Sequence, residues 1–190
     1  NGNYSGHVRI YDWNGSSWLQ RGQDIDGEAA GDQSGYSVSL NSDGNTVAIG
    51  APYNDGNGNS SGHVRLYDWA GTSWIQRLND LDGEAQFDQS GYSISLSSDG
   101  NKVAIGAPYN HKTSSQSGTY SGHVRIYDWD GSMWTQRGQD IDGELSLDYS
   151  GRAVSISSDG NKVAIGSPSN DGNGSDAGHV RVFQNQSLST

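Results

Sequence analysis

Carboxylate side chains recur in one short pattern that could hold a metal ion. Asp24, Asp26 and Glu28 occupy every second position, and Asp32 follows four residues later. Alternating oxygen ligands near a glycine can wrap a hard cation, so calcium is the cofactor that such loops would hold. The alternative is an acidic turn whose carboxylates accept hydrogen bonds from nearby backbone N–H groups. The pattern occurs three times, and its candidate metal ligands are Asp24, Asp26, Glu28, Asp32, Asp80, Asp82, Glu84, Asp88, Asp140, Asp142, Glu144 and Asp148.

In a second pattern, each repeat has two tryptophans, one on each side of a short turn. Two such rings can pack against each other across a hairpin, or they can present a platform to sugar rings. Cross-strand packing is the interpretation that we favour. Ligand binding stays open as the alternative for Trp13, Trp18, Trp69, Trp74, Trp129 and Trp134.

Histidine occurs in the motif Gly-His-Val-Arg, which is found four times. If equivalent histidines lie on successive packed sheets, they are about 10 Å apart. Several imidazoles on different sheets therefore cannot reach one ion through bonds of about 2 Å. We assign structural roles within their own sheets to His7, His63, His123 and His179.

The sequence indicates a protein that is not an enzyme. It contains no Gly-x-Ser-x-Gly elbow, phosphate loop or His-Glu-x-x-His motif. Its carboxylates repeat equally in three units, whereas catalytic carboxylates need different environments and roles. Equal repetition of these carboxylates favours a structural role or multivalent binding.

Composition narrows the possible partners. The 190 residues carry a formal net charge of -11, with no cysteine and 28 glycines. Nucleic acids are bound by clustered Lys and Arg, so they are excluded as expected partners. No apolar run approaches the roughly 18 residues of a membrane span, which argues against membrane insertion. The absence of cysteine removes disulfides and thiolate catalysis.

Internal repetition dominates the sequence. The Gly-His-Val-Arg motifs begin at Gly6, Gly62, Gly122 and Gly178, which gives offsets of 56, 60 and 56 residues, and residues 5–54 share 38 of 50 identities with residues 61–110. The four extra residues lie in a Ser/Gly-rich stretch, as expected for a surface loop. We expect a single repeat domain over residues 1–190, with repeats at about 5–60, 61–120 and 121–177 and a partial fourth repeat at 178–190.

Each repeat of 56–60 residues reads as four short strands. In the first complete set, residues 35–40 alternate with period two, Asp43-Gly44 marks a tight hairpin, and residues 46–50, 63–69 and 73–77 follow as strands. The sequence predicts an all-β protein with β-propeller-like blades of four antiparallel strands, in about three tandem repeats. Counting from residue 1 gives 13 strands, with partial blades at both ends.

The strand before each Gly-Ala-Pro motif identifies a family resemblance. Gly50-Ala51-Pro52 and Gly106-Ala107-Pro108 each follow a Val-Ala-Ile strand. These elements resemble the FG-GAP repeats of integrin alpha-subunit propellers, and most closely the bacterial and algal branch with a Trp-rich outer hairpin. The Phe-Gly element is Ser-Gly here. The resemblance implies a calcium site in the first hairpin, but Ser-Asp-Gly-Asn is too short to supply six or more oxygens, so we do not transfer that site.

These features together predict a non-catalytic extracellular structural or adhesion module. Unpaired strands at both ends would favour a head-to-tail multimer or filament, unless the blades complete a larger propeller. The alternative is a multivalent carbohydrate-binding, lectin-like module. The expected partners are copies of the chain itself, an extracellular protein or a glycan, and the expected location is extracellular or at the cell surface.

Overall fold

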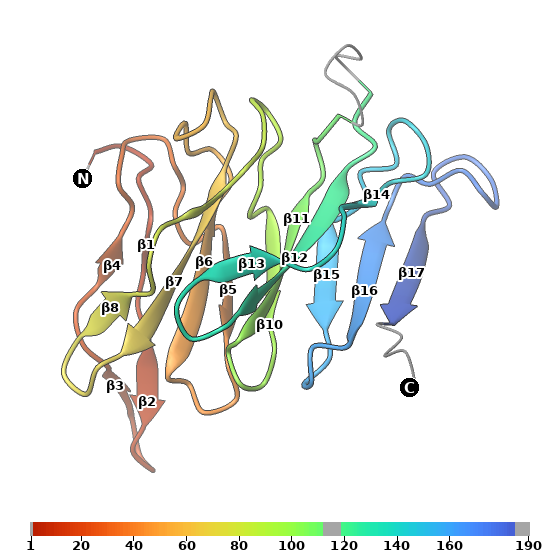
Figure 1. Ribbon diagram of the computed structural model, residues 1–190. Helices are drawn as coiled ribbons and strands as arrows, with labels where there is room; N and C mark the ends of the chain where they lie inside the picture. The colour runs from red at the N-terminus through yellow and green to blue at the C-terminus, as the bar shows by residue number, and fades with distance from the viewer. Residues whose placement is uncertain (1, 112–118, 185–190) are drawn as a thin grey trace.

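The described part of the chain is built from strands, turns and loops. The computed structural model describes residues 2–111 and 119–184, and these residues form 17 strands and no helix. Hence no described helix could span a membrane. Figure 1 shows the strands as successive sheets standing side by side, with β1–β4 at one end of the row and β15–β17 at the other. The predicted all-β class with propeller-like blades is confirmed, and the described blades do not close into a ring.

The strands fall into four groups along the sequence. The N-terminal unit contains β1 (His7–Val8), β2 (Tyr11–Trp13), β3 (Trp18–Gln20) and β4 (Ile25–Asp26). The first blade contains β5 (Ser37–Leu40), β6 (Thr46–Ala51), β7 (His63–Trp69), β8 (Trp74–Gln76) and β9 (Leu81–Asp82). The second blade contains β10 (Ser93–Leu96), β11 (Lys102–Ala107), β12 (His123–Trp129), β13 (Trp134–Gln136) and β14 (Ile141–Asp142). The third blade contains β15 (Ala153–Ile156), β16 (Lys162–Ser167) and β17 (His179–Gln184).

The outermost strand of each complete blade is interrupted, which the sequence analysis did not predict. In the first blade, β8 and β9 both pair with β7, at Trp69↔Trp74 and His63↔Asp82. The chain bulges between them, and Leu78 adopts a left-handed φ of 60°. Such interruptions, together with the break between β1 and β2, turn the expected 13 strands into 17.

Adjacent groups are held together by apolar contact. In β7, Val64 and Leu66 face the second blade and are fully buried against Ile94 and Val103. Tyr67 lies on the opposite face of β7 and packs against the N-terminal unit. A third cluster joins the second and third blades. Each complete blade therefore buries both of its faces, as expected for a sheet packed between sheets.

Neighbouring blades approach each other at backbone distance where β6 meets the residues before β10 and where β11 meets the residues before β15. A Cβ placed on Gly50 would lie 2.1 Å from the carbonyl oxygen of Gly91. Ser37 donates a hydrogen bond to that same oxygen, at 2.7 Å. The second and third blades repeat this contact at Gly106, where a Cβ would lie 2.1 Å from the oxygen of Gly151. The glycine of the Gly-Ala-Pro motif is thus required by the contact between blades.

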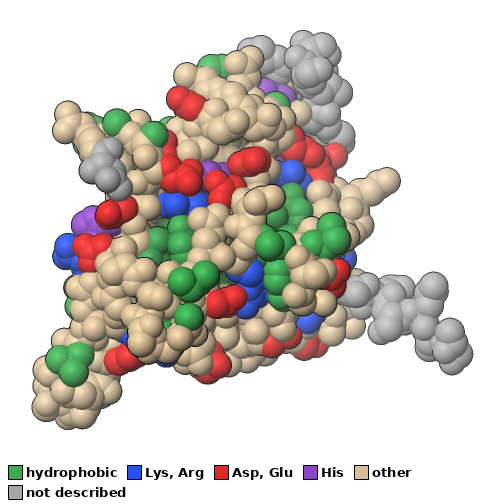
Figure 2. Space-filling model, turned by 60° about the vertical axis from the view of Figure 1, so that its left-hand side comes forward, with side chains coloured by type: hydrophobic (Ala, Val, Ile, Leu, Met, Phe, Trp, Pro, Cys, Tyr) green, Lys and Arg blue, Asp and Glu red, His purple; other side chains and the backbone are tan. Residues whose placement is uncertain are grey.

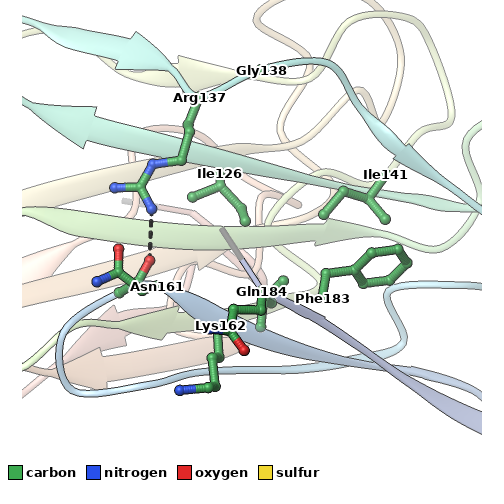
Figure 3. A pocket seen from close by; sticks show the side chains of 10 residues that line it. Ile126, Arg137, Gly138, Ile141, Asn161, Lys162, Phe183 and Gln184 are labelled. Atoms are coloured by element: carbon green, nitrogen blue, oxygen red, sulfur yellow. Dashed lines mark hydrogen bonds between the residues drawn. The ribbon is translucent and has the colours of Figure 1, made fainter. Parts of the chain in front are cut away.

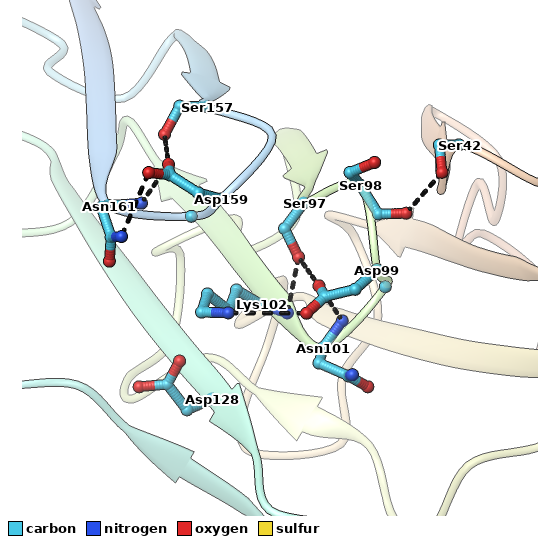
Figure 4. Close-up of polar contacts among 12 residues, drawn as sticks. Ser42, Ser97, Ser98, Asp99, Asn101, Lys102, Asp128, Ser157, Asp159 and Asn161 are labelled. Carbon is cyan, nitrogen blue, oxygen red and sulfur yellow. Dashed lines mark hydrogen bonds and ion pairs between the residues drawn. The ribbon is translucent and has the colours of Figure 1, made fainter.

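The hairpins that follow the innermost strands are held by hydrogen bonds among their own polar groups. The Asp99 carboxylate accepts hydrogen bonds from Ser97 and from the backbone of Asn101 (Figure 4). Ser42 also bridges two hairpins by donating to the carbonyl oxygen of Ser98, at 2.9 Å. Hydrogen bonds from Ser157 and Asn161 lower the pKa of Asp159 to about 2. The carboxylates of these hairpins are therefore committed to holding tight turns.

The glycine contact gives a matched pair of variants. We expect Gly106→Ala to destabilise the protein strongly, because its new methyl group would overlap the backbone of Gly151. Gly166→Ala is the control, because its methyl group would meet nothing closer than the Cβ of Ala153, at 3.5 Å. Thermal unfolding should show a Tm several degrees lower for Gly106→Ala than for Gly166→Ala. Equal melting temperatures would contradict the contact.

Candidate functional site: the interfaces between blades

The four acids of each predicted loop do not gather around one point. Asp32, Asp88 and Asp148 are buried, and each accepts a hydrogen bond from the backbone N–H three residues earlier, at 3.0 Å. Asp32 and Asp148 also accept a hydrogen bond at 3.0 Å from the side chains of Asn54 and Asn170. These three acids tie the connection before a blade to a loop within that blade.

The second acid of each loop takes part in the contact between blades through its backbone carbonyl oxygen. Asp26, Asp82 and Asp142 are the last residues of β4, β9 and β14. Their carbonyl oxygens accept hydrogen bonds from Arg65, Arg125 and Arg181 of the following blade, at 2.7 to 2.8 Å. The Arg of each later Gly-His-Val-Arg motif therefore fastens its blade to the preceding group of strands.

The remaining acids come together with histidine, but they come from different repeats. Glu28 follows β4, His63 lies in β7, and Asp80 lies in the bulge between β8 and β9. The same arrangement recurs one repeat later with Glu84, His123 and Asp140, and in each group the potential ligand atoms lie within 4.8 Å of one another. Both histidines are 1% exposed. Among the described residues, these are the two His-containing groups of three able to hold a metal ion.

The two ends of the chain hold incomplete versions of this group. At the N-terminal end Asp24 pairs with Arg9, at 2.9 Å, and His7 is exposed. At the third blade Glu144 lies 3.7 Å from both His179 and Arg181. A complete group needs a Glu from the preceding connection and an Asp from the outer bulge of the same blade.

Burial controls the charge of the second complete group. It lowers the pKa of His123 to about 4, and the positive charge of Arg125 acts in the same direction. Burial also raises the pKa of Glu84, and nearby Asp140 and Asp88 add to this rise against the opposing charge of Arg125. The imidazole is therefore neutral at pH 7, and the carboxylates beside it repel one another.

The outer tryptophans of the complete blades pack between blades. The rings of Trp69 and Trp74 pack in a tilted arrangement with their centroids 5.2 Å apart, and the Arg21 guanidinium of the N-terminal unit lies 4.8 Å from the Trp69 ring. The Trp74 indole also donates a hydrogen bond to the Arg21 carbonyl oxygen, at 2.8 Å. Arg77 covers Trp129 and Trp134 in the same way. The favoured packing interpretation fits these four rings, while Trp13 and Trp18 are 55% and 66% exposed.

A tyrosine strip, which the sequence analysis missed, runs along one end of the blades. Tyr36, Tyr92 and Tyr109 follow one another with ring centroids 4.8 and 6.0 Å apart. Tyr149 continues the strip at 5.5 Å from Tyr109, and Arg152 lies over Tyr92 at 4.9 Å. The available signal was a Tyr directly after the Ser-Gly or Gly-Ala-Pro element in the first two blades.

The strand order and the repeated interfaces define a β-propeller-type repeat protein. Residues 25–67 match the family model of the FG-GAP repeat. The chain therefore contains an FG-GAP repeat in this segment, which confirms the resemblance seen in the Gly-Ala-Pro elements. A search of the curated proteins gives no match.

Two solved structures share the fold. A "putative 6-phosphogluconolactonase" from Bacteroides uniformis superposes with a TM-score of 0.61 and 10% identity, over 97% of this chain and 46% of that one. A second protein so described, from Bacteroides fragilis, gives 0.58 and 16% over 90% of this chain and 40% of that one. This chain spans less than half the length of either, and identities this low show a common fold alone.

The buried tryptophans predict a stability difference between two residues with equivalent positions in the repeat. We expect Trp74→Ala to lower the free energy of unfolding by about 3–5 kcal/mol, since it removes a buried ring and a hydrogen bond. We expect Trp18→Ala to change it by about 0.5 kcal/mol or less, because that ring is exposed. Denaturant unfolding measures both. Similar losses would show that Trp18 is also packed in solution.

Proposed function

We propose that the protein is a non-catalytic structural module of an extracellular or cell-surface assembly, in which copies associate head to tail. FG-GAP repeats commonly occur in extracellular proteins, which supports this location. The observation that carries the proposal is an open socket between the second and third blades. It corresponds to the site where the N-terminal unit receives the tryptophan pair of the first blade.

The filled socket shows what the open one would accept. In the N-terminal unit, Ile10 and Ile25 pack in one cluster with Trp74 and Trp69. Gly22 lies directly beneath these rings, because a Cβ there would approach Trp69 to 2.6 Å. The shape of this site is therefore matched to a tilted tryptophan pair.

The corresponding residues of the second blade line a cavity of about 240 Å³ (Figure 3). These residues are Ile126, Arg137, Gly138 and Ile141, and Phe183 of the third blade lines the cavity opposite them. A Cβ on Gly138 would meet no atom within 4 Å. Beside the cavity, β17 pairs with β16 alone among the described strands.

The β2–β3 hairpin of a second copy has the matching chemistry. The rings of Trp13 and Trp18 pack at a tilt with their centroids 5.4 Å apart, almost as those of Trp69 and Trp74 do, and both are exposed. Figure 2 turns the N-terminal side of the molecule forward and shows hydrophobic side chains grouped among charged ones on that surface. Insertion of this hairpin would place a tryptophan pair in the socket and would give β17 a second partner strand.

Self-association can be tested with the exposed tryptophans. We expect light scattering of the full chain to show multimers whose mass rises with protein concentration. The double variant Trp13→Ala/Trp18→Ala should be monomeric, because it removes the occupant of the socket while leaving the buried core intact. Tyr4→Ala is the control, since Tyr4 is 80% exposed and lies outside the hairpin. A wild-type monomer at all concentrations, or a double variant that still assembles, would refute the proposal.

Carbohydrate binding is a second candidate function, and the tyrosine strip favours it. A cavity of about 350 Å³ is lined by Tyr109, Tyr149, Arg152, Pro168 and Ser169. Half-exposed rings beside a guanidinium offer stacking surface and hydrogen-bond donors to a sugar. Arg21 and Arg77 cover four of the six tryptophans, so the tryptophan pairs of the two complete blades are blocked on one side by a guanidinium.

A glycan array tests the second candidate. If the tyrosine strip binds sugars, a defined glycan should bind saturably, and Tyr149→Ala should weaken its affinity by at least tenfold. Trp18→Ala should leave that affinity unchanged, because Trp18 lies on the outer hairpin. The absence of saturable binding to any glycan would remove this candidate without affecting the self-association proposal.

A further inference from the structure

The two Glu–His–Asp groups have the geometry of incomplete coordination shells. His63 Nδ1 lies 3.3 Å from Asp80 Oδ2 and 4.0 Å from Glu28 Oε2. In the second group, His123 Nδ1 lies 3.5 Å from Asp140 Oδ2 and 3.9 Å from Glu84 Oε2. Ligands of a tetrahedral zinc ion with bonds of about 2.0–2.1 Å are about 3.4 Å apart. Small side-chain shifts would therefore bring each set to coordination distance.

The other oxygen of each carboxylate is held by a separate donor. Arg65 Nη1 lies 3.5 Å from Glu28 Oε1, on the opposite side of that carboxylate from His63. Gln76 donates a hydrogen bond to Asp80 Oδ1 at 2.7 Å, which leaves Oδ2 facing the imidazole. Hydrogen bonds to the second oxygen are how proteins orient carboxylate ligands of metals.

The second group repeats both supporting contacts. Arg125 Nη1 lies 3.6 Å from Glu84 Oε1, and Gln136 donates to Asp140 Oδ1 at 2.7 Å. In both groups, two carboxylate oxygens and one imidazole nitrogen lie within 4.8 Å of one another. The second oxygen of each carboxylate faces a donor outside the group.

The second group also opens to solvent. Glu84 and Asp140 line a cleft of about 570 Å³ together with Gln136 and His111. An ion could enter through this cleft, and a water molecule could occupy a fourth coordination position.

We propose that each group binds one divalent transition-metal ion of the zinc class, through the Glu Oε2, His Nδ1 and Asp Oδ2 atoms. Calcium prefers six to eight oxygen ligands, whereas an imidazole with two carboxylates suits zinc. Because Glu28 and Glu84 lie in the connections that precede their blades, a bound ion would fasten each connection to its blade. This inference is independent of self-association.

Titration of the full chain with zinc tests the proposal. In metal-stripped buffer, isothermal titration calorimetry should give two bound Zn²⁺ per chain, and zinc should raise the Tm because it binds the folded state. Glu84→Gln should lose one ion, and Glu28→Gln/Glu84→Gln should lose both. Gln76→Leu should weaken the affinity of the first site by about 10–100-fold, because it frees Asp80.

Glu144→Gln is the matched control. It removes a glutamate that faces a His and an Arg as Glu28 and Glu84 do, but no described aspartate completes its group. It should keep both zinc ions, and the Tm of each variant without metal reports any loss of folding. A group held only by hydrogen bonds would give a Tm insensitive to zinc and to chelators, which would overturn the proposal. Two ions retained by the double variant, or calcium bound in preference to zinc, would also overturn it.

Discussion

Direct backbone contact between neighbouring blades, at glycines of β6 and β11, sets the spacing on which the rest of the molecule depends. At Gly50 and Gly106 the neighbouring blade lies where a Cβ would otherwise be. At this spacing Ser39 can accept a hydrogen bond from Leu96 of the next blade, at 3.0 Å. Further out, the same spacing lets Arg125 reach the carbonyl oxygen of Asp82. A wider separation would leave these polar groups without partners and open the apolar clusters to water.

Much of the fold could be predicted because the repeat exposes its own periodicity. Alternation with period two located β5 and β10, Asp-Gly located the hairpins, and Gly-Ala-Pro located the ends of β6 and β11. The split outer strand could not be predicted, because the residues from Arg77 to Asp80 carry no Gly-Asn or Asp-Gly turn signal. The bulge is held by tertiary and side-chain contacts, such as the hydrogen bonds that Gln76 donates to Leu78 and Asp80.

The candidate sites were harder to predict, for a physical reason. Spacing along the chain grouped Glu28 with Asp24 and Asp32, yet packing places Glu28 beside His63, which lies 35 positions later. The spacing of residues within one repeat does not predict which residues of different repeats come into contact. Sequence reasoning identified the acids and the histidines separately, and predicted that each histidine stays within its own sheet. The structure adds that His63 and His123 each also face a glutamate from the preceding connection.

Each interface joins only groups that are adjacent in the sequence, as the three apolar clusters show. The stability of such a chain is approximately a sum of one term for each repeat and one for each neighbouring pair. The first and second blades each have two neighbours, whereas β1–β4 and β15–β17 each have one among the described strands. Unfolding from either end therefore breaks a single interface at a time, and it leaves the remaining blades with their contacts intact. The described strands thus form a linear array of interfaces, in which β7 and β12 each contribute to the apolar clusters on both sides of their blade.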